Sequence, residues 1–149
     1  MNDINQFQYV NQDCCCFNLR KVTRAITQFY DRYLEPADIR ATQFTLLVEL
    51  SNSAGKTLTD MAEGLVMDRT TLTRNLKPLD KAGLIESVPL TDKRSKGYAL
   101  TEKGRMVLAK GHPLWKNAQH QIVGQLGQER YQRLVNELNV LKGYTHPSG

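Results

Sequence analysis

The chain has 149 residues, which is enough for one domain with its own hydrophobic core. Its 20 lysines and arginines outnumber its 15 aspartates and glutamates, and the resulting charge of +5 at pH 7 favours a polyanionic partner. No apolar run is long enough to span a membrane, and the first residues lack a signal-peptide pattern. We therefore expect a cytoplasmic protein with no membrane partner.

The N-terminal segment is expected to form a long amphipathic helix over residues 13–35, with Asp13 as its N-cap. Apolar side chains recur along it at steps of three and four, the spacing of one helix face. These are Cys15, Leu19, Val22, Ile26, Phe29 and Tyr33. The helix should end near Glu35, because a residue that precedes proline disfavours helical backbone angles.

Three shorter helices are predicted next, the first over residues 42–52. Thr57 and Asp60 have the spacing of a capping box at the start of the second, and Asp68 is the expected N-cap of the third. Pro78 predicts a bend or a 3₁₀ turn near Asn75 in this third helix. The expected core residues of the three helices are Phe44, Leu47, Leu50, Met61, Ala62, Leu65, Leu72, Leu76 and Leu79.

A short hairpin and two long helices complete the predicted order of elements. Gly83 should cap the preceding helix, and residues 85–89 and 97–100 are predicted strands joined by a charged turn. Thr101 should cap a long helix that Pro113 kinks, and residues 124–127 should separate it from a last helix. The apolar stripes of the terminal helices are wide for a monomer, so we expect a homodimer.

This order predicts a mainly α (α+β) fold, a winged helix-turn-helix over residues 41–101. Residues 13–35 and 102–145 would then be the dimerisation helices. In such a fold a basic helix enters the major groove of double-stranded DNA and the hairpin lies against the minor groove or the backbone. A two-fold dimer suits a palindromic operator, whose half-sites lie about one helical turn, roughly 34 Å, apart.

The motifs resemble those of the MarR family of dimeric winged helix-turn-helix regulators over nearly the whole chain. The most specific are Leu65-x-x-Asp68-Arg69-x-x-Leu72-x-Arg74-x-Leu76-x-x-Leu79, Gly83-Leu84-Ile85, Asp92-x-Arg94 and Leu100-Thr101-x-x-Gly104. The resemblance implies that the helix from Arg69 to Lys81 reads DNA. It implies base-edge contacts from its first half, namely Arg69, Thr70, Thr71, Thr73 and Arg74. Lys77 would contact phosphates, and Arg94 would enter the minor groove beside Lys93, oriented by Asp92.

Three adjacent cysteines, Cys14, Cys15 and Cys16, stand at the start of the first predicted helix. A helix N-terminus stabilises a thiolate, so these residues are candidate sensors of a thiol-reactive signal. Cys16-Phe17-x-Leu19 and Tyr30 resemble the organic hydroperoxide resistance branch of the family, which implies a sensing role for this thiol and this phenol. Arg20 and Ala41 stand where two further tyrosines of that branch would be.

Three hypotheses for the control of DNA binding follow from the sequence. The first is a repressor released by an oxidant, an electrophile or a thiophilic metal at the cysteines. The second has structural cysteines and a small aromatic effector in a pocket between the reading region and the dimerisation helices. The third is a constitutive DNA-binding protein. A protein-interaction module without DNA is disfavoured by the basic wing tip.

No resident metal, cofactor or catalytic activity is expected. Three consecutive helical residues point about 100° apart and do not converge on one zinc ion, so a zinc site would need residues of the partner subunit to complete it. The sequence has no CxxC, no cysteine paired with a plausible histidine base and no glycine-rich phosphate loop. We therefore expect a regulator and not an enzyme.

Overall fold

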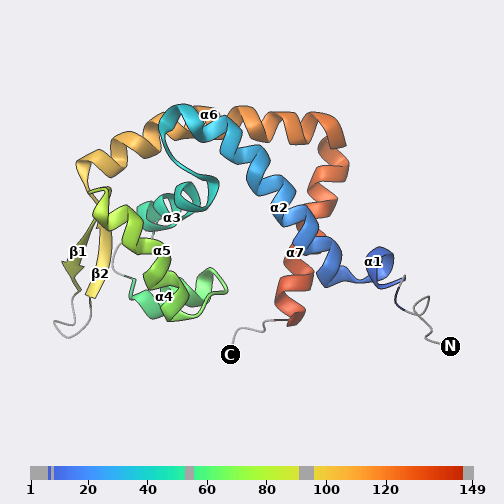
Figure 1. Ribbon diagram of the computed structural model, residues 1–149, viewed down its shortest axis with the longest axis horizontal. Helices are drawn as coiled ribbons and strands as arrows, with labels where there is room; N and C mark the ends of the chain where they lie inside the picture. Colours follow the sequence, from blue (N-terminus) through green and yellow to red (C-terminus); the bar gives the residue numbers. More distant parts are fainter. Residues whose placement is uncertain (1–6, 8, 53–55, 91–95, 146–149) are drawn as a thin grey trace.

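A computed structural model describes residues 7, 9–52, 56–90 and 96–145 of the chain. Seven α-helices and two strands lie in the order α1 to α5, β1, β2, α6 and α7 within this part. Figure 1 shows α3, α4, α5 and the strands on one side of the molecule and α2 with α7 on the other. Helix α6 extends between the two sides in Figure 1, so it connects the reading region, residues 41–101, to the terminal helices α2 and α7.

The N-terminal elements are α1 (Val10–Asp13) and α2 (Cys15–Leu34), and a 3₁₀ turn at Glu35–Ala37 follows them. The long helix and its end before Pro36 are confirmed. The predicted N-cap is wrong, because Asp13 is the last residue of α1 and Cys14 caps α2 with extended backbone angles. Its sulfur accepts a weak 3.5 Å hydrogen bond from the Phe17 N–H. The thiol thus provides a partner for one backbone N–H in the first turn of α2.

Helices α3 (Ala41–Asn52), α4 (Leu58–Gly64) and α5 (Arg69–Lys81) form the core of the reading region. The capping box of Thr57 with Asp60 and the cap of Asp68 are both present, as predicted. The predicted inward side chains of these helices are buried, except that of Leu65, which is half-buried at the C-cap of α4. The 3₁₀ turn expected near Asn75 does not form, because α5 remains α-helical through Pro78. The Pro78 side chain is exposed, and the inward leucines on either side of it hold the helix against the core.

The wing strands β1 (Ile85–Pro89) and β2 (Lys96–Leu100) pair antiparallel, with Ile85 opposite Leu100 and Pro89 opposite Lys96. Gly83 has a φ of +71° and ends α5 in a Schellman motif. Its N–H donates to the Asp80 carbonyl at 2.9 Å, and the Leu84 N–H donates to the Leu79 carbonyl at 3.0 Å. This turn directs the chain from the reading helix into the wing.

Helix α6 (Glu102–Leu126) begins at the predicted Thr101 cap and continues through Pro113, and Figure 1 shows that its path curves. The break comes at Gly127, where φ is +80°, and α7 (Gln128–Thr145) follows. Gly111 allows α6 to approach α3 closely, because a Cβ there would lie 3.0 Å from the Phe44 ring. In the described part of the chain no helix combines the length and apolarity needed to cross a lipid bilayer.

Candidate functional site

Asp68 holds the first turn of α5. Its carboxylate accepts the Thr71 N–H at 2.8 Å and the Thr71 hydroxyl at 2.6 Å. These bonds, the hydroxyl first, hold the pKa of Asp68 below its ordinary value of 3.8. The half-buried Thr71, predicted to contact bases, therefore has its hydroxyl engaged within the helix cap.

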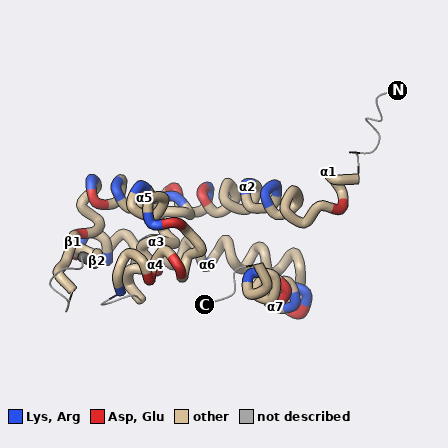
Figure 2. The backbone as a smooth tube through the Cα atoms, turned by 90° about the horizontal axis from the view of Figure 1, so that it is seen from below, with Lys and Arg blue, Asp and Glu red and all other residues tan. Residues whose placement is uncertain are grey.

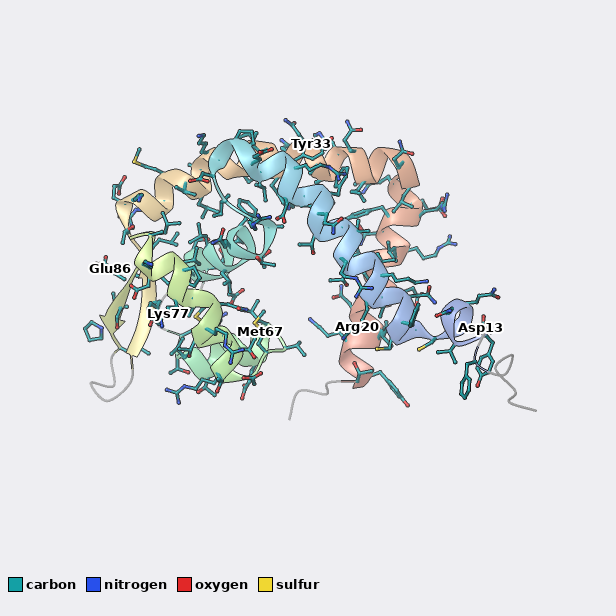
Figure 3. All side chains as sticks on the ribbon, in the orientation of Figure 1. Asp13, Arg20, Tyr33, Met67, Lys77 and Glu86 are labelled. Atoms are coloured by element: carbon teal, nitrogen blue, oxygen red, sulfur yellow. The ribbon has the colours of Figure 1, made fainter. Side chains whose placement is uncertain are left out.

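The other predicted readers share one exposed face of α5. They are Arg69, Thr70, Thr73, Arg74 and Lys77. All five line a single open groove together with Asp80 and Tyr98. Figure 2 marks the lysines and arginines of the chain in blue, and Figure 3 labels Lys77 on α5. Guanidinium and hydroxyl groups on one face of an exposed helix are suited to base edges and phosphates.

Tyr98 of β2 also lines the groove, although no role was predicted for it from the sequence. It lies on the same strand face as the buried Leu100, two residues on, and is itself half-buried. Period-two alternation from Leu100 would have placed it on the α5 side of the hairpin. The predicted wing residues Asp92, Lys93 and Arg94 lie outside the described residues.

The C-terminal end of α5 is fastened to the start of α6. The Thr101 hydroxyl donates to the Gly83 carbonyl at 2.7 Å, and the Lys103 ammonium donates to the Ala82 carbonyl at 2.8 Å. The Thr101 Oγ1 also accepts the Gly104 N–H at 3.0 Å. Carbonyls that a helix end leaves without partners thus find them on the next helix, so α5 and α6 should move together.

The three cysteines do not share one environment. The half-buried Cys14 faces the first turn of α2 as its cap. Cys15 and Cys16 are exposed and open into a groove of about 670 Å³ between α2 and α7. The other groove residues are Leu19, Arg20, Thr23, Arg24, Leu141 and Thr145. Figure 3 labels Arg20 on α2.

Tyr30, the fourth predicted sensing residue, does not join the cysteines within one chain. It lies about 21 Å along the axis of α2 from Cys16. Its hydroxyl donates to the Gln119 side-chain oxygen at 2.6 Å, and the Gln119 amide donates to the Tyr131 hydroxyl at 2.6 Å. Burial, and then the neighbouring Tyr131, raises the pKa of Tyr30 above 10.0. Tyr30 therefore connects α2 with α6 and α7.

A capped reading helix followed by a Schellman turn and a two-stranded wing defines a winged helix-turn-helix, a class of DNA-binding proteins. A model of the MarR family matches residues 39–96. The chain is 32% identical over 108 residues to the organic hydroperoxide resistance transcriptional regulator of Bacillus subtilis (strain 168), covering 71% of this chain and 74% of that protein. The chain therefore belongs to the MarR family, and it is a DNA-binding transcriptional regulator and not an enzyme.

Further matches agree with this assignment. The chain is 28% identical over 90 residues to the HTH-type transcriptional regulator SarZ of Staphylococcus haemolyticus (strain JCSC1435), covering 60% of this chain and 61% of SarZ, less than two thirds of its length. The crystal structure of the M. tuberculosis transcriptional regulator MosR in complex with DNA has a TM-score of 0.81 and 34% identity. That match covers 89% of this chain and 96% of MosR.

Proposed function

We propose that this regulator is a homodimeric repressor that leaves a palindromic operator when a thiol-reactive signal modifies its N-terminal cysteines. The observation that carries the proposal is the groove between α2 and α7, into which Cys15 and Cys16 open beside Arg20. Both helices belong to the proposed dimerisation regions, residues 13–35 and 102–145. A modification in this groove would therefore act where the two subunits meet.

Reading of the operator is assigned to the exposed face of α5. Arg69 and Arg74 are suited to bidentate contacts with guanine, and Lys77 is suited to a phosphate. In the segment between the two wing strands, which lies outside the described residues, we assign Arg94 to the minor groove, with Lys93 beside it and Asp92 orienting it. Since backbone contacts release counterions, the affinity should fall steeply with salt concentration.

The signal is proposed to change the distance between the two reading helices of the dimer. An adduct in the groove would displace α2 relative to α7, and α6 would carry that displacement to α5 through the bonds of Thr101 and Lys103. Release requires only that the operator bind the unmodified arrangement better than the modified one. Both reading helices must fit successive major grooves, so a small change in spacing is sufficient.

An effector pocket is the second candidate mode of control. A cavity of about 240 Å³ lies between α2, α3 and α6, at the junction of the reading and terminal helices. Its walls include Tyr30, Phe44 and Trp115, which suit a small aromatic ligand. In this alternative the cysteines are structural and the aromatic ligand releases the operator.

These proposals are tested by a gel shift at controlled salt concentration. The DNA probe is the region upstream of the gene that contains a palindromic site. Reduced wild-type protein should bind this site. Treatment with an organic hydroperoxide should lower the affinity of the wild type at least tenfold and leave the affinity of Cys16→Ser unchanged. Arg74→Ala should lose its affinity for the palindromic site. Arg130→Ala, which removes an exposed charge from α7, should keep that affinity. Release of a variant with all three cysteines replaced by serine, on adding an aromatic carboxylate, would support the effector pocket instead.

A further inference from the structure

Two adjacent thiols open into the same groove, and this pair has a chemistry beyond oxidation. Cys15 and Cys16 are the first two residues of α2, and both side chains are exposed at the groove. Leu19 and Leu141 supply apolar surface from the two facing helices, and Arg20 and Arg24 supply positive charge. The groove therefore combines two soft nucleophiles with an apolar wall.

We propose that Cys15 and Cys16 together chelate one trivalent arsenic centre, with an organic substituent of the arsenic on the wall formed by Leu19 and Leu141. The inference rests on the proposed function, because it names the chemical class of the thiol-reactive signal. Two thiols on neighbouring residues need not converge as the four ligands of a zinc ion do. They close a nine-membered ring through the backbone between them around one soft atom, so the second bond forms within the same molecule.

The chemistry balances without an oxidant or a reductant. Phenylarsine oxide reacts with two thiols to form two arsenic–sulfur bonds, and its oxygen leaves as one water carrying both thiol protons. Arsenous acid reacts in the same way with loss of two waters, and it retains one hydroxyl. In both products arsenic remains trivalent and both sulfurs remain reduced.

The groove does not suit a divalent metal ion. Within the described part of the chain no group of three or more histidine, cysteine or acidic side chains is arranged to hold one, whereas structural zinc takes four such ligands. Arg20 and Arg24 have no carboxylate partner among the described ion pairs, so their charge opposes a dication. Arsenous acid and phenylarsine oxide arrive without charge and escape this repulsion.

Cys14 is excluded from the chelate by its place in the fold. Its sulfur is turned to the Phe17 N–H at the cap, and it does not line the groove. Serine in its place would still cap α2, because a hydroxyl accepts the same hydrogen bond. Cys14→Ser is therefore a matched control that removes a thiol and keeps the helix start.

The test is a titration of the reduced full-length chain with phenylarsine oxide, followed by intact-mass measurement. Wild type and Cys14→Ser should each gain one phenylarsenic group at one equivalent and keep it against excess monothiol. Cys15→Ser and Cys16→Ser should lose the adduct under the same challenge. A parallel titration with arsenous acid distinguishes inorganic from organic trivalent arsenic. Phenylarsine oxide should bind at least tenfold more tightly than arsenous acid, because only its phenyl group contacts the apolar wall.

The outcomes separate the site from the function. Loss of the adduct in Cys14→Ser, or its persistence in either Cys15→Ser or Cys16→Ser, would overturn the chelate. An adduct that forms while operator binding stays unchanged in the gel shift would support the chelate and reject control by the cysteines. Release by hydroperoxide without any stable arsenic adduct would reject the chelate and support thiol control.

Discussion

Single carboxylates decide how the reading region begins its helices. Asp60 and Asp68 each accept hydrogen bonds from a threonine hydroxyl and a backbone N–H, and these bonds lower both pKa values below 3.8. A lowered folded-state pKa adds stability that is complete above the unfolded-state value and is lost as pH falls through the folded-state value. The caps of α4 and α5 should therefore weaken in acid.

At the scale of residues, we predict that Asp68→Asn makes the free energy of unfolding depend less on pH in acid. Asparagine still caps a helix but does not titrate, so wild type should lose stability relative to the variant as pH falls below 3.8. Urea denaturation at a series of pH values measures the difference. Glu137→Gln on α7 is the control, and an equal change in both variants would contradict the assignment to the cap.

At the scale of elements, the start of α6 lies against the turn between α5 and the wing. Gly104 makes this contact possible, because a Cβ at this position would overlap the Leu84 carbonyl oxygen, which belongs to the backbone and has little freedom to move. The same carbonyl accepts the Thr101 N–H at 3.1 Å. The orientation of the wing relative to α6 therefore depends on having glycine, which has no side chain, at position 104.

We predict that Gly104→Ala lowers the free energy of unfolding by about 3 kcal/mol or more, as severe overpacking does. Gly124→Ala, in the same helix, meets no atom within 4 Å and should raise it by up to ~1 kcal/mol, because alanine favours helix more than glycine does. Chemical denaturation followed by circular dichroism compares the two. Equal stability of the two variants would show that α6 can withdraw from Leu84 without loss.

At the scale of the molecule, the terminal helices expose more apolar surface than a monomer would be expected to leave uncovered. Val22 and Ile26 on α2 are 55% and 37% exposed, and Leu134 and Leu138 on α7 are 46% and 41% exposed. Burial of such side chains contributes roughly 1.5–3 kcal/mol each when it is complete. A second copy of the chain is the partner that we propose for this surface.

Sedimentation should therefore find a dimer, and Leu138→Asp should convert it to a monomer with weaker operator binding. The monomer makes half the phosphate contacts, so the dependence of affinity on salt should become shallower. Thr59→Asp, which introduces the same charge at an exposed residue of α4 outside both dimerisation regions, should leave the dimer intact. A monomeric wild type would reject the dimer and with it the transmission from the cysteine groove.

Local signals predicted most of the elements because their causes are local. The capping box of Thr57, the Asp68 cap, the Thr101 cap and the glycine after α5 lie within a few residues of the groups that they satisfy. The prediction of Asp13 as the cap of α2 was wrong, because a local signal does not distinguish two neighbouring residues at a helix start. Asp13 and Cys14 are both adjacent to the helix, and only backbone angles decide between them.

Side-chain roles were harder to predict than elements. The exposed face of α5 follows from helical spacing, but the use of Thr71 by the cap depends on its rotamer, and Tyr98 entered the groove from another element. The positive φ of Val66, +54° in the turn before α5, is unusual for a β-branched residue and carries no sequence signal. The turn lies between α4 and α5, which pack on each other.

The sequence by itself determined the order of helices and strands, their caps and the basic face of α5, since these depend on neighbours in the chain. Only the tertiary structure decided that Cys15 and Cys16 open onto α7 while Cys14 turns to its own helix. It likewise decided that Tyr30 joins Gln119 and Tyr131 and not the cysteines. Contacts between distant segments depend on how whole helices cross, and a local pattern does not record that angle.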